Sequence, residues 1–372
     1  MRHPILTAVA ASVATALLIL PLSAHHEITA KFDPGKTTKL SGVVTNVDWA
    51  NPHVHIFMNV GTGNNMVNWA VELESVVELQ AAKFARDTVK PGDAITVEGP
   101  LARNGSKQVW GTTVTLVAGN KRVFNVPEDT FAAPKTPAAP TPRWADGKPK
   151  LGPADGNSTG FWARPSMTIL AETGVSVQAN KHGLLARIAD AAKVAPFQPW
   201  AKDLFVTRQQ NRLADDPQYL YCLPPGGPRQ FQEAYGVQFV EDKDHQRVFV
   251  FVGSVDRNWR LIYLDGRQQV GQIRGDADNP LYYGRSVGKW EGDSLVVDTK
   301  GFNEKFWFSN GGLPHTDKLH LVEKFTRTDM NTLKYEVTID DPGAYTKTWN
   351  SGWNLTWIPE ELPVFFCQDN RP

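Results

Sequence analysis

The sequence predicts a mainly β protein in two parts: a small N-terminal barrel, then a larger antiparallel barrel or sandwich with a short helical insertion. The chain has 372 residues, among them 12 Trp, 8 Tyr and 18 Phe, and aromatic residues favour strands. Short runs in which apolar and polar residues alternate recur in both parts, and turn residues separate these runs. A proline-rich stretch between the two parts indicates a linker.

Residues 1–24 have the features of a secretory signal peptide. Arg2 precedes an apolar run over residues 5–22, and Ala24 offers a small residue at the cleavage position. An uncleaved membrane anchor is the alternative, because the run is nearly long enough to span a bilayer. Cleavage would make His25 the new N-terminus of a periplasmic or secreted protein. No later segment is apolar enough to predict a transmembrane helix.

Charge and cysteine content limit the partners and the redox chemistry. Lys and Arg together number 39, as do Asp and Glu, so we expect no basic surface for nucleic acid. The two cysteines, Cys222 and Cys367, predict a disulfide in an exported protein. A catalytic thiolate is the alternative. The sequence makes no prediction of oligomeric state.

Residues 25–126 show the element order of an OB-like barrel, which is three strands, a helix and two strands. The predicted strands cover residues 40–49, 53–60, 67–73, 94–99 and 109–116, and the predicted helix covers residues 76–84. The linker follows over residues 127–159. It contains seven prolines, at positions 127, 134, 137, 140, 142, 149 and 153.

Residues 160–372 form the predicted larger β domain. Two helical stretches, over residues 182–193 and 200–213, precede its main β region. Turns such as Asp265-Gly266 separate the later strands, which favours an antiparallel meander. The strand at 248–252 is apolar at every position, so we expect both of its faces to be covered. The predicted strands cover residues 248–252, 259–264, 284–290, 294–299, 320–326, 332–339 and 346–357.

Four strings give the chain a resemblance to a known group of proteins. They are Asn51-Pro52-His53, the run from Trp69 to Glu72, SVGKWEGDSLVVDTKGFN at 286–303 and TIDDPGAYTKTW at 338–349. The chain resembles a large bacterial family of exported, mostly uncharacterised proteins that join an OB-like domain to a C-terminal β domain. This resemblance implies the fold and export, but no particular reaction. Members of this family commonly end in Cys-x-Glu-Asn-Asn, whereas this chain has Cys367-Gln-Asp-Asn370, with the shorter Asp in place of Glu. This difference favours a structural role for the cysteine.

The start of the larger domain, Gly160-Phe161-Trp162, is similar to the opening of lipocalin-like barrels, in which the Trp closes one end. Barrels of this size hold one small ligand. We therefore expect the domain to bind a hydrophobic small molecule. Pairing of the arginines with aspartates across the rim is the alternative role for the polar groups near the barrel mouth. The candidates for binding the polar part of a ligand are Arg260, Tyr263, Arg267 and Tyr283.

A polar cluster in the same domain suggests general acid–base catalysis. His315, Asp317 and His320 lie close in sequence, and imidazoles beside carboxylates exchange protons near neutral pH. Asp340 and Tyr345 are their expected partners. The corresponding hypothesis is a cofactor-independent isomerase, lyase or ring-opening hydrolase. The alternative is a loop histidine and a hydrogen-bonded inner histidine without a catalytic role.

A second hypothesis places function in the N-terminal domain. His53 and His55 are two residues apart, so they point to the same side of one strand. After signal cleavage His25 would add an α-amine and an imidazole, a combination that suits Cu(II). The sequence therefore also supports a periplasmic copper-binding protein whose larger domain recognises a partner. A structural protein of the cell envelope is a third class.

Overall fold

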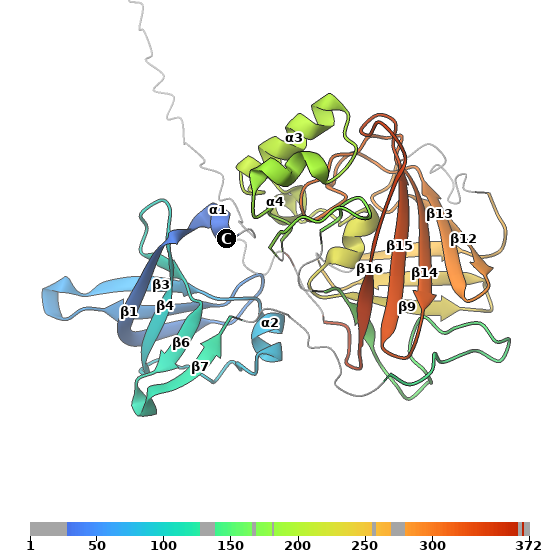
Figure 1. Ribbon diagram of the computed structural model, residues 1–372. Helices are drawn as coiled ribbons and strands as arrows, with labels where there is room; N and C mark the ends of the chain where they lie inside the picture. Colours follow the sequence, from blue (N-terminus) through green and yellow to red (C-terminus); the bar gives the residue numbers. More distant parts are fainter. Residues whose placement is uncertain are drawn as a thin grey trace, which may run out of the picture.

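The computed structural model describes residues 28–126, 138–165, 169–180, 182–254, 258–268, 280–363 and Cys367. Figure 1 shows two β structures of different size, with α2 (Val76–Ala81) and α4 (Pro217–Tyr221) between them. The predicted mainly β fold, with a closed barrel in each part, is confirmed. The predicted signal peptide and His25 lie outside the described residues. No helix among the described residues is long and apolar enough to cross a bilayer.

The N-terminal part is a seven-stranded sheet that closes on itself because β1 pairs with both β2 and β4. The strand order is β1-β2-β3-β5-β4, and β6 and β7 continue from β4. The strands are β1 (Phe32–Asp48), β2 (His55–Val60), β3 (Val67–Glu72), β4 (Ala94–Ala102), β5 (Gln108–Trp110), β6 (Thr113–Leu116) and β7 (Lys121–Asn125). The helices are α1 (Ile28–Lys31), α2 (Val76–Ala81) and the 3-10 turns η1 (Gly63–Asn65) and η2 (Ala118–Asn120).

Two N-terminal strands depart from the prediction for local reasons. β1 begins at Phe32 rather than at residue 40, and an irregularity between Asp33 and Thr37 interrupts the alternation that the sequence would otherwise show. The predicted strand at 109–116 is two strands. β5 pairs with β3 and β6 pairs with β4, and between them Gly111 packs where a Cβ atom would lie 2.6 Å from Leu73 Cδ2.

The C-terminal part is a closed barrel in the order β10-β11-β12-β13-β14-β15-β16-β8-β9. Neighbouring strands are antiparallel except β11 and β12, which pair in parallel. The chain between these two strands is long enough for a parallel connection, so the predicted antiparallel meander is wrong at this point. The strands are β8 (Phe161–Ala163), β9 (Val237–Asp242), β10 (Arg247–Val252), β11 (Asn258–Tyr263), β12 (Arg285–Glu291), β13 (Ser294–Lys300), β14 (His320–Arg327), β15 (Thr332–Asp340) and β16 (Trp349–Ile358).

The apolar sequence of β10 predicts that both of its faces are covered, but only its inner face is fully buried. Val248, Val250 and Val252 are buried, whereas Phe249 and Phe251 are half-buried on the outer face. The two phenyl rings stack on each other with centroids 6.1 Å apart, which reduces the apolar surface that they expose.

Both predicted helices of the insertion are shorter than predicted, and two further short helices follow them. The insertion contains η3 (Ile188–Lys193), α3 (Pro199–Gln210), α4 (Pro217–Tyr221) and η4 (Gly227–Gln232). The predicted helix at 182–193 is wrong before Ile188. There Asn180 Oδ1 accepts hydrogen bonds from the backbone N–H groups of His182 and Leu184, and Gly183 has a φ of 83°, so the chain makes a turn.

One end of the larger barrel is closed by aromatic rings and by part of the predicted linker. Arg327 lies 4.9 Å from the ring centroids of both Trp162 and Trp357. Trp162 Nε1 donates to the carbonyl oxygen of Leu151 at 2.7 Å, and Leu151 is fully buried. This segment, which the sequence places in a linker, therefore packs on the barrel. Its prolines prevent regular secondary structure without preventing burial.

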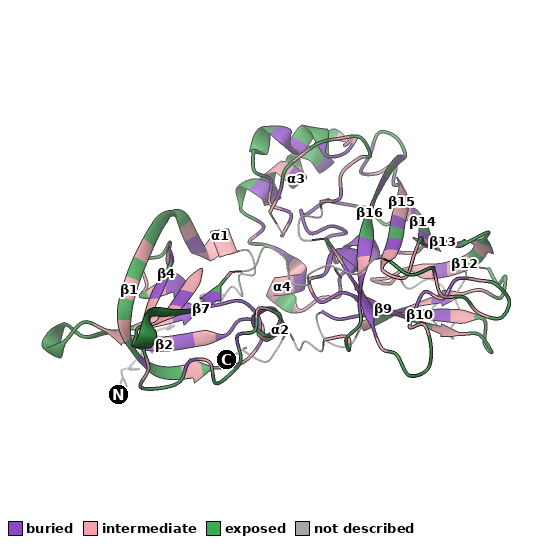
Figure 2. Ribbon diagram, turned by 60° about the horizontal axis from the view of Figure 1, so that its bottom comes forward, coloured by how far each residue is buried: buried purple, intermediate pink, exposed green. Residues whose placement is uncertain are grey.

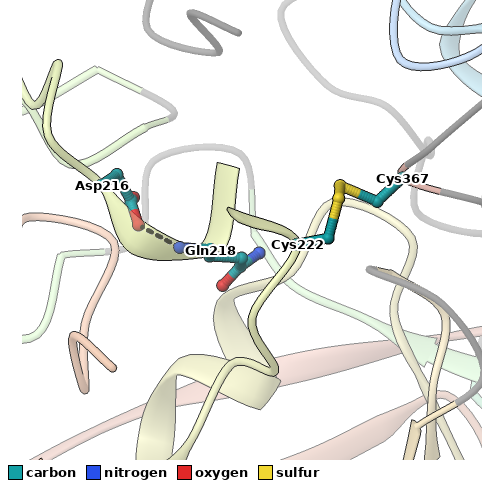
Figure 3. Close-up of a disulfide and its surroundings, with 4 residues drawn as sticks. All are labelled: Asp216, Gln218, Cys222 and Cys367. Atoms are coloured by element: carbon teal, nitrogen blue, oxygen red, sulfur yellow. Dashed lines mark hydrogen bonds between the residues drawn. A yellow bond between two sulfur atoms is a disulfide. The ribbon is translucent and has the colours of Figure 1, made fainter. Parts of the chain in front are cut away.

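The predicted disulfide between Cys222 and Cys367 is present, with Cα atoms 5.8 Å apart (Figure 3). Cys222 follows α4, whose first turn is capped by Asp216 through a hydrogen bond from the N–H of Gln218. Val77 of α2 and Cys222 both pack against the buried cluster of Tyr235 and Cys367, so the disulfide lies where the two barrels meet. Figure 2 shows that the buried residues concentrate inside the barrels and around this junction.

We predict that reducing the disulfide destabilises the larger domain. The bond closes a loop with a sequence separation of 145, and loop entropy alone gives up to about 5 kcal/mol of stabilisation. Urea unfolding with and without dithiothreitol measures the effect. The variant Cys222→Ser/Cys367→Ser should match the reduced wild type and should not respond to the reductant. An unchanged midpoint on reduction would contradict the prediction.

Candidate functional site

Arg260, a predicted ligand-binding residue, lies inside the larger barrel, where it forms an ion pair with Glu323. Arg260 and Glu323 are 2 % and 0 % exposed. Arg260 Nη1 donates to Glu323 Oε1 at 3.1 Å, and Arg260 Nη2 donates to Glu323 Oε2. Ser286 Oγ and Thr299 Oγ1 accept from the guanidinium at 2.9 and 2.7 Å, and Tyr335 Oη donates to the carboxylate at 3.0 Å. The geometry makes Arg260 a structural residue.

Aromatic side chains fill the barrel beside this pair. Phe231 enters from η4, and its ring centroid lies 4.6 Å from that of Tyr335 and 5.2 Å from that of Phe325. The ring centroid of Phe239 lies 6.4 Å from that of Phe231. A ligand at this level would have to displace buried rings and an ion pair, so the middle of the barrel is core.

The other predicted ligand-binding residues lie elsewhere. Arg267 stacks over the ring of Tyr263 at 3.8 Å and its Nε donates to Asp265 at 2.8 Å, which is a pairing within one turn and not across the rim. Tyr283 Oη is buried and has no hydrogen-bond partner among the described residues. Burial raises the pKa of the Tyr283 phenol well above its ordinary value. These residues do not form one site.

His315 and Tyr345, two predicted catalytic residues, meet in a buried aromatic cluster. His315 Nε2 lies 3.0 Å from the carbonyl oxygen of Phe306, and its Nδ1 lies 3.2 Å from that of Thr316. Tyr345 Oη donates to the carbonyl oxygen of Pro314 at 2.7 Å. Because backbone carbonyls occupy these polar atoms, both side chains brace the loop before β14.

The remaining predicted catalytic residues lie on the outer surface. His320 Nε2 is 3.1 Å from Asp298 Oδ1, and its strand partner Asp340 accepts a hydrogen bond from Thr348 Oγ1 at 3.2 Å. Asp317 is exposed in the loop. Since His320 faces outward and His315 is buried, the structure does not bring the two histidines together.

We predict that the stability conferred by His315 depends on pH. Burial lowers the pKa of His315, so below about pH 6.5, the ordinary value, the unfolded chain takes up the proton more readily than the folded chain. The difference in free energy of unfolding between the wild type and His315→Gln should therefore be largest above that pH. It should become smaller as the pH falls to 5. Urea unfolding of both proteins across this range is the measurement. A pH-independent difference would contradict the assignment.

We also predict that Arg260→Met lowers the free energy of unfolding by about 3–5 kcal/mol, because it leaves the Glu323 charge buried without its cation. The double variant Arg260→Met/Glu323→Leu should recover most of this loss. Arg143→Met is the matched control, since Arg143 and Asp293 form an exposed pair, and its unfolding midpoint should stay close to that of the wild type. A double variant as unstable as the single one would contradict the prediction.

The predicted metal ligands of the N-terminal barrel share one buried carboxylate. His53 Nδ1 lies 2.7 Å from Glu72 Oε1, and His55 Nε2 lies 3.5 Å from Glu72 Oε2. Lys31 Nζ donates to Glu72 Oε2 at 2.5 Å. Burial by itself raises the pKa of Glu72, but the hydrogen bonds from both histidines and the charge of Lys31 outweigh it, so this pKa is well below its ordinary value. Glu72 is therefore a carboxylate at neutral pH.

The sheet determines this arrangement. His55 and Glu72 are directly paired on β2 and β3, so their side chains share one face, and His53 lies on that face two residues earlier. Glu72 also pairs with Trp110 on β5, whose ring meets His53 edge-on at 5.2 Å. Sequence reasoning missed the role of Glu72, although a carboxylate that ends an alternating apolar strand was the available signal.

The chain begins its described course beside this site. Ile28 of α1 packs with Phe32, Ala102 and Trp110, and Lys31 at the end of α1 holds Glu72. Among the described residues, no group of three or more His, Cys, Asp or Glu side chains is arranged to hold a metal ion. His25, the third predicted ligand, lies outside them.

Residues 12–111 match the model of a family of unknown function, DUF6152. The match agrees with the predicted resemblance to an uncharacterised family, and it spans His53, His55, Glu72 and Trp110. No curated protein matches the chain. These comparisons assign no activity to the chain.

Proposed function

We propose that this chain is an exported protein whose N-terminal barrel binds Cu(II) through His25, His53 and His55. The observation that carries the proposal is the buried Glu72 carboxylate, which meets an imidazole nitrogen of both His53 and His55. Signal cleavage after Ala24 is part of the proposal, because it creates the α-amine of His25.

Glu72 has the role that carboxylates commonly take behind metal-binding histidines. A ligating imidazole usually donates its second N–H to a carboxylate, which fixes the ring and its tautomer. Here Glu72 accepts from Nδ1 of His53, which puts Nε2 on the far side of the ring as the ligating nitrogen. His55 turns Nε2 toward Glu72, so its Nδ1 is the corresponding nitrogen. Lys31 balances the buried charge without occupying either of these ligand positions.

The position of Ile28, the first described residue, supports His25 as the third ligand. His25 precedes Ile28 by three residues, which span at most about 10 Å when extended. Ile28 packs on Trp110, and that ring contacts His53. An amine and three imidazoles form a nitrogen donor set, which suits Cu(II), the strongest binder of such ligands among the divalent first-row metals.

The test is Cu(II) titration of the processed protein, followed by calorimetry and by electron paramagnetic resonance for nitrogen coordination. Glu72→Gln should weaken binding about 10–100-fold, as expected for loss of a carboxylate behind the ligands. His53→Ala and His55→Ala should weaken binding at least as much, and an extra Gly before His25 should remove the α-amine contribution.

His245→Ala is the matched control, because His245 is an exposed histidine beside a carboxylate, Asp242, outside this site. Its Cu(II) affinity should equal that of the wild type. Circular dichroism of each variant confirms that the barrel remains folded. Equal affinity in His53→Ala, Glu72→Gln and the Gly-extended protein would refute the proposal.

A further inference from the structure

A cavity of about 230 Å³ lies at the closed end of the larger barrel, and none of the residues predicted to bind a ligand lines it. Its walls come from the turn that carries Trp144, from the β9–β10 hairpin, from Leu264 after β11 and from Trp290 of β12. All of these elements belong to the described residues, and none of them takes part in the proposed copper site.

The cavity exists because the barrel is thinly paired at this point. β11 and β12 share only two register pairs, Ile262 with Ser286 and Tyr263 with Val287. Gly288 lets the neighbouring Leu264 approach, since a Cβ atom there would lie 2.9 Å from Leu264 Cδ2. The barrel centre is filled by Phe231 and the Arg260–Glu323 pair, so this gap is separate from the filled centre.

The floor and one wall of the cavity are apolar and held in place. Val248 is buried in the barrel core, and Leu264 and Trp290 pack against that core. Trp144 is fixed by Glu241, whose Oε1 accepts from Trp144 Nε1 at 3.0 Å. Glu241 Oε2 also accepts from the backbone N–H of Leu151 at 2.8 Å, so the carboxylate itself is anchored.

The charged rim is electrically balanced. Lys243 pairs with Asp146 at 2.5 Å and Arg247 pairs with Asp242 at 2.7 Å. Lys148 and Glu241 complete three cations and three carboxyl groups around the cavity. Lys148 Nζ donates to the carbonyl oxygen of Gly292 at 3.4 Å, and Glu241 accepts from Trp144 and the backbone. The rim therefore has no net charge that would favour an ionic ligand, and an uncharged ligand leaves both ion pairs intact.

We infer that this cavity binds one compact, uncharged, apolar molecule that contacts Leu264, Trp144 and Trp290. The volume is below the usual range of about 300–1,000 Å³ for drug-sized ligands, which restricts the ligand to one or two rings. The inference moves the expected apolar ligand from the barrel centre to its closed end, and it does not rest on the copper proposal.

The test uses indole and cyclohexanol as compact uncharged probes, with metal-free full-length protein and isothermal calorimetry. We expect both to bind, with indole the tighter. Leu264→Trp should fill the cavity and weaken indole binding at least tenfold. Trp144→Ala, which removes a wall without filling the space, should weaken it too. Thermal unfolding checks that both variants remain folded.

Trp259→Ala is the matched control, because Trp259 is 55 % exposed on the outer face of β11 and reports binding to surface aromatic rings. It should bind indole as the wild type does. The inference fails if neither probe binds at millimolar concentration, if Leu264→Trp and Trp144→Ala retain wild-type affinity, or if Trp259→Ala alone abolishes binding.

Discussion

The ion pair between Arg260 and Glu323 ties together strands that are not neighbours in the larger barrel. The guanidinium comes from β11 and the carboxylate from β14, and hydroxyl groups from β12, β13 and β15 complete their hydrogen bonds. A strand that slipped by one residue would turn its polar group to the outside and leave its partners buried and unpaired. The network therefore forms only when all five strands are in this register.

The same interaction limits where the barrel can hold a ligand. The pair and the ring of Phe231 occupy the centre, so residues that would serve as polar anchors in an open lumen are part of the core here. Space remains at the end where β11 and β12 barely pair. The barrel is therefore filled at its centre and has space at the end where two of its strands are weakly paired. In a barrel that is filled in the middle, the interior can change shape only at the ends.

Each barrel contains a buried carboxylate, and the partner of that carboxylate decides what it can do. Glu323 faces a guanidinium, which stays charged at all relevant pH values, so it is a fixed structural element. Glu72 faces two imidazoles and an ammonium group. Imidazoles have a second ring nitrogen that can bind a metal, whereas a guanidinium has none to offer. The two carboxylates are similarly buried, but Glu323 stabilises the larger barrel whereas Glu72 belongs to the proposed metal site of the smaller one.

The sequence by itself determined the mainly β class and its two parts, because alternation and turn residues are local signals. It left the larger part open between a barrel and a sandwich, and it favoured the disulfide over a free thiolate; the closed barrel and the bond are properties of the tertiary structure. It also placed His53 and His55 on one face. Only the tertiary structure decided which polar residues meet. It paired Arg260 with Glu323 and separated His315 from His320. It also placed the imidazoles of His53 and His55 beside the carboxylate of Glu72. These contacts join residues far apart in the chain, and strand order and register, which set them, are properties of the closed sheet.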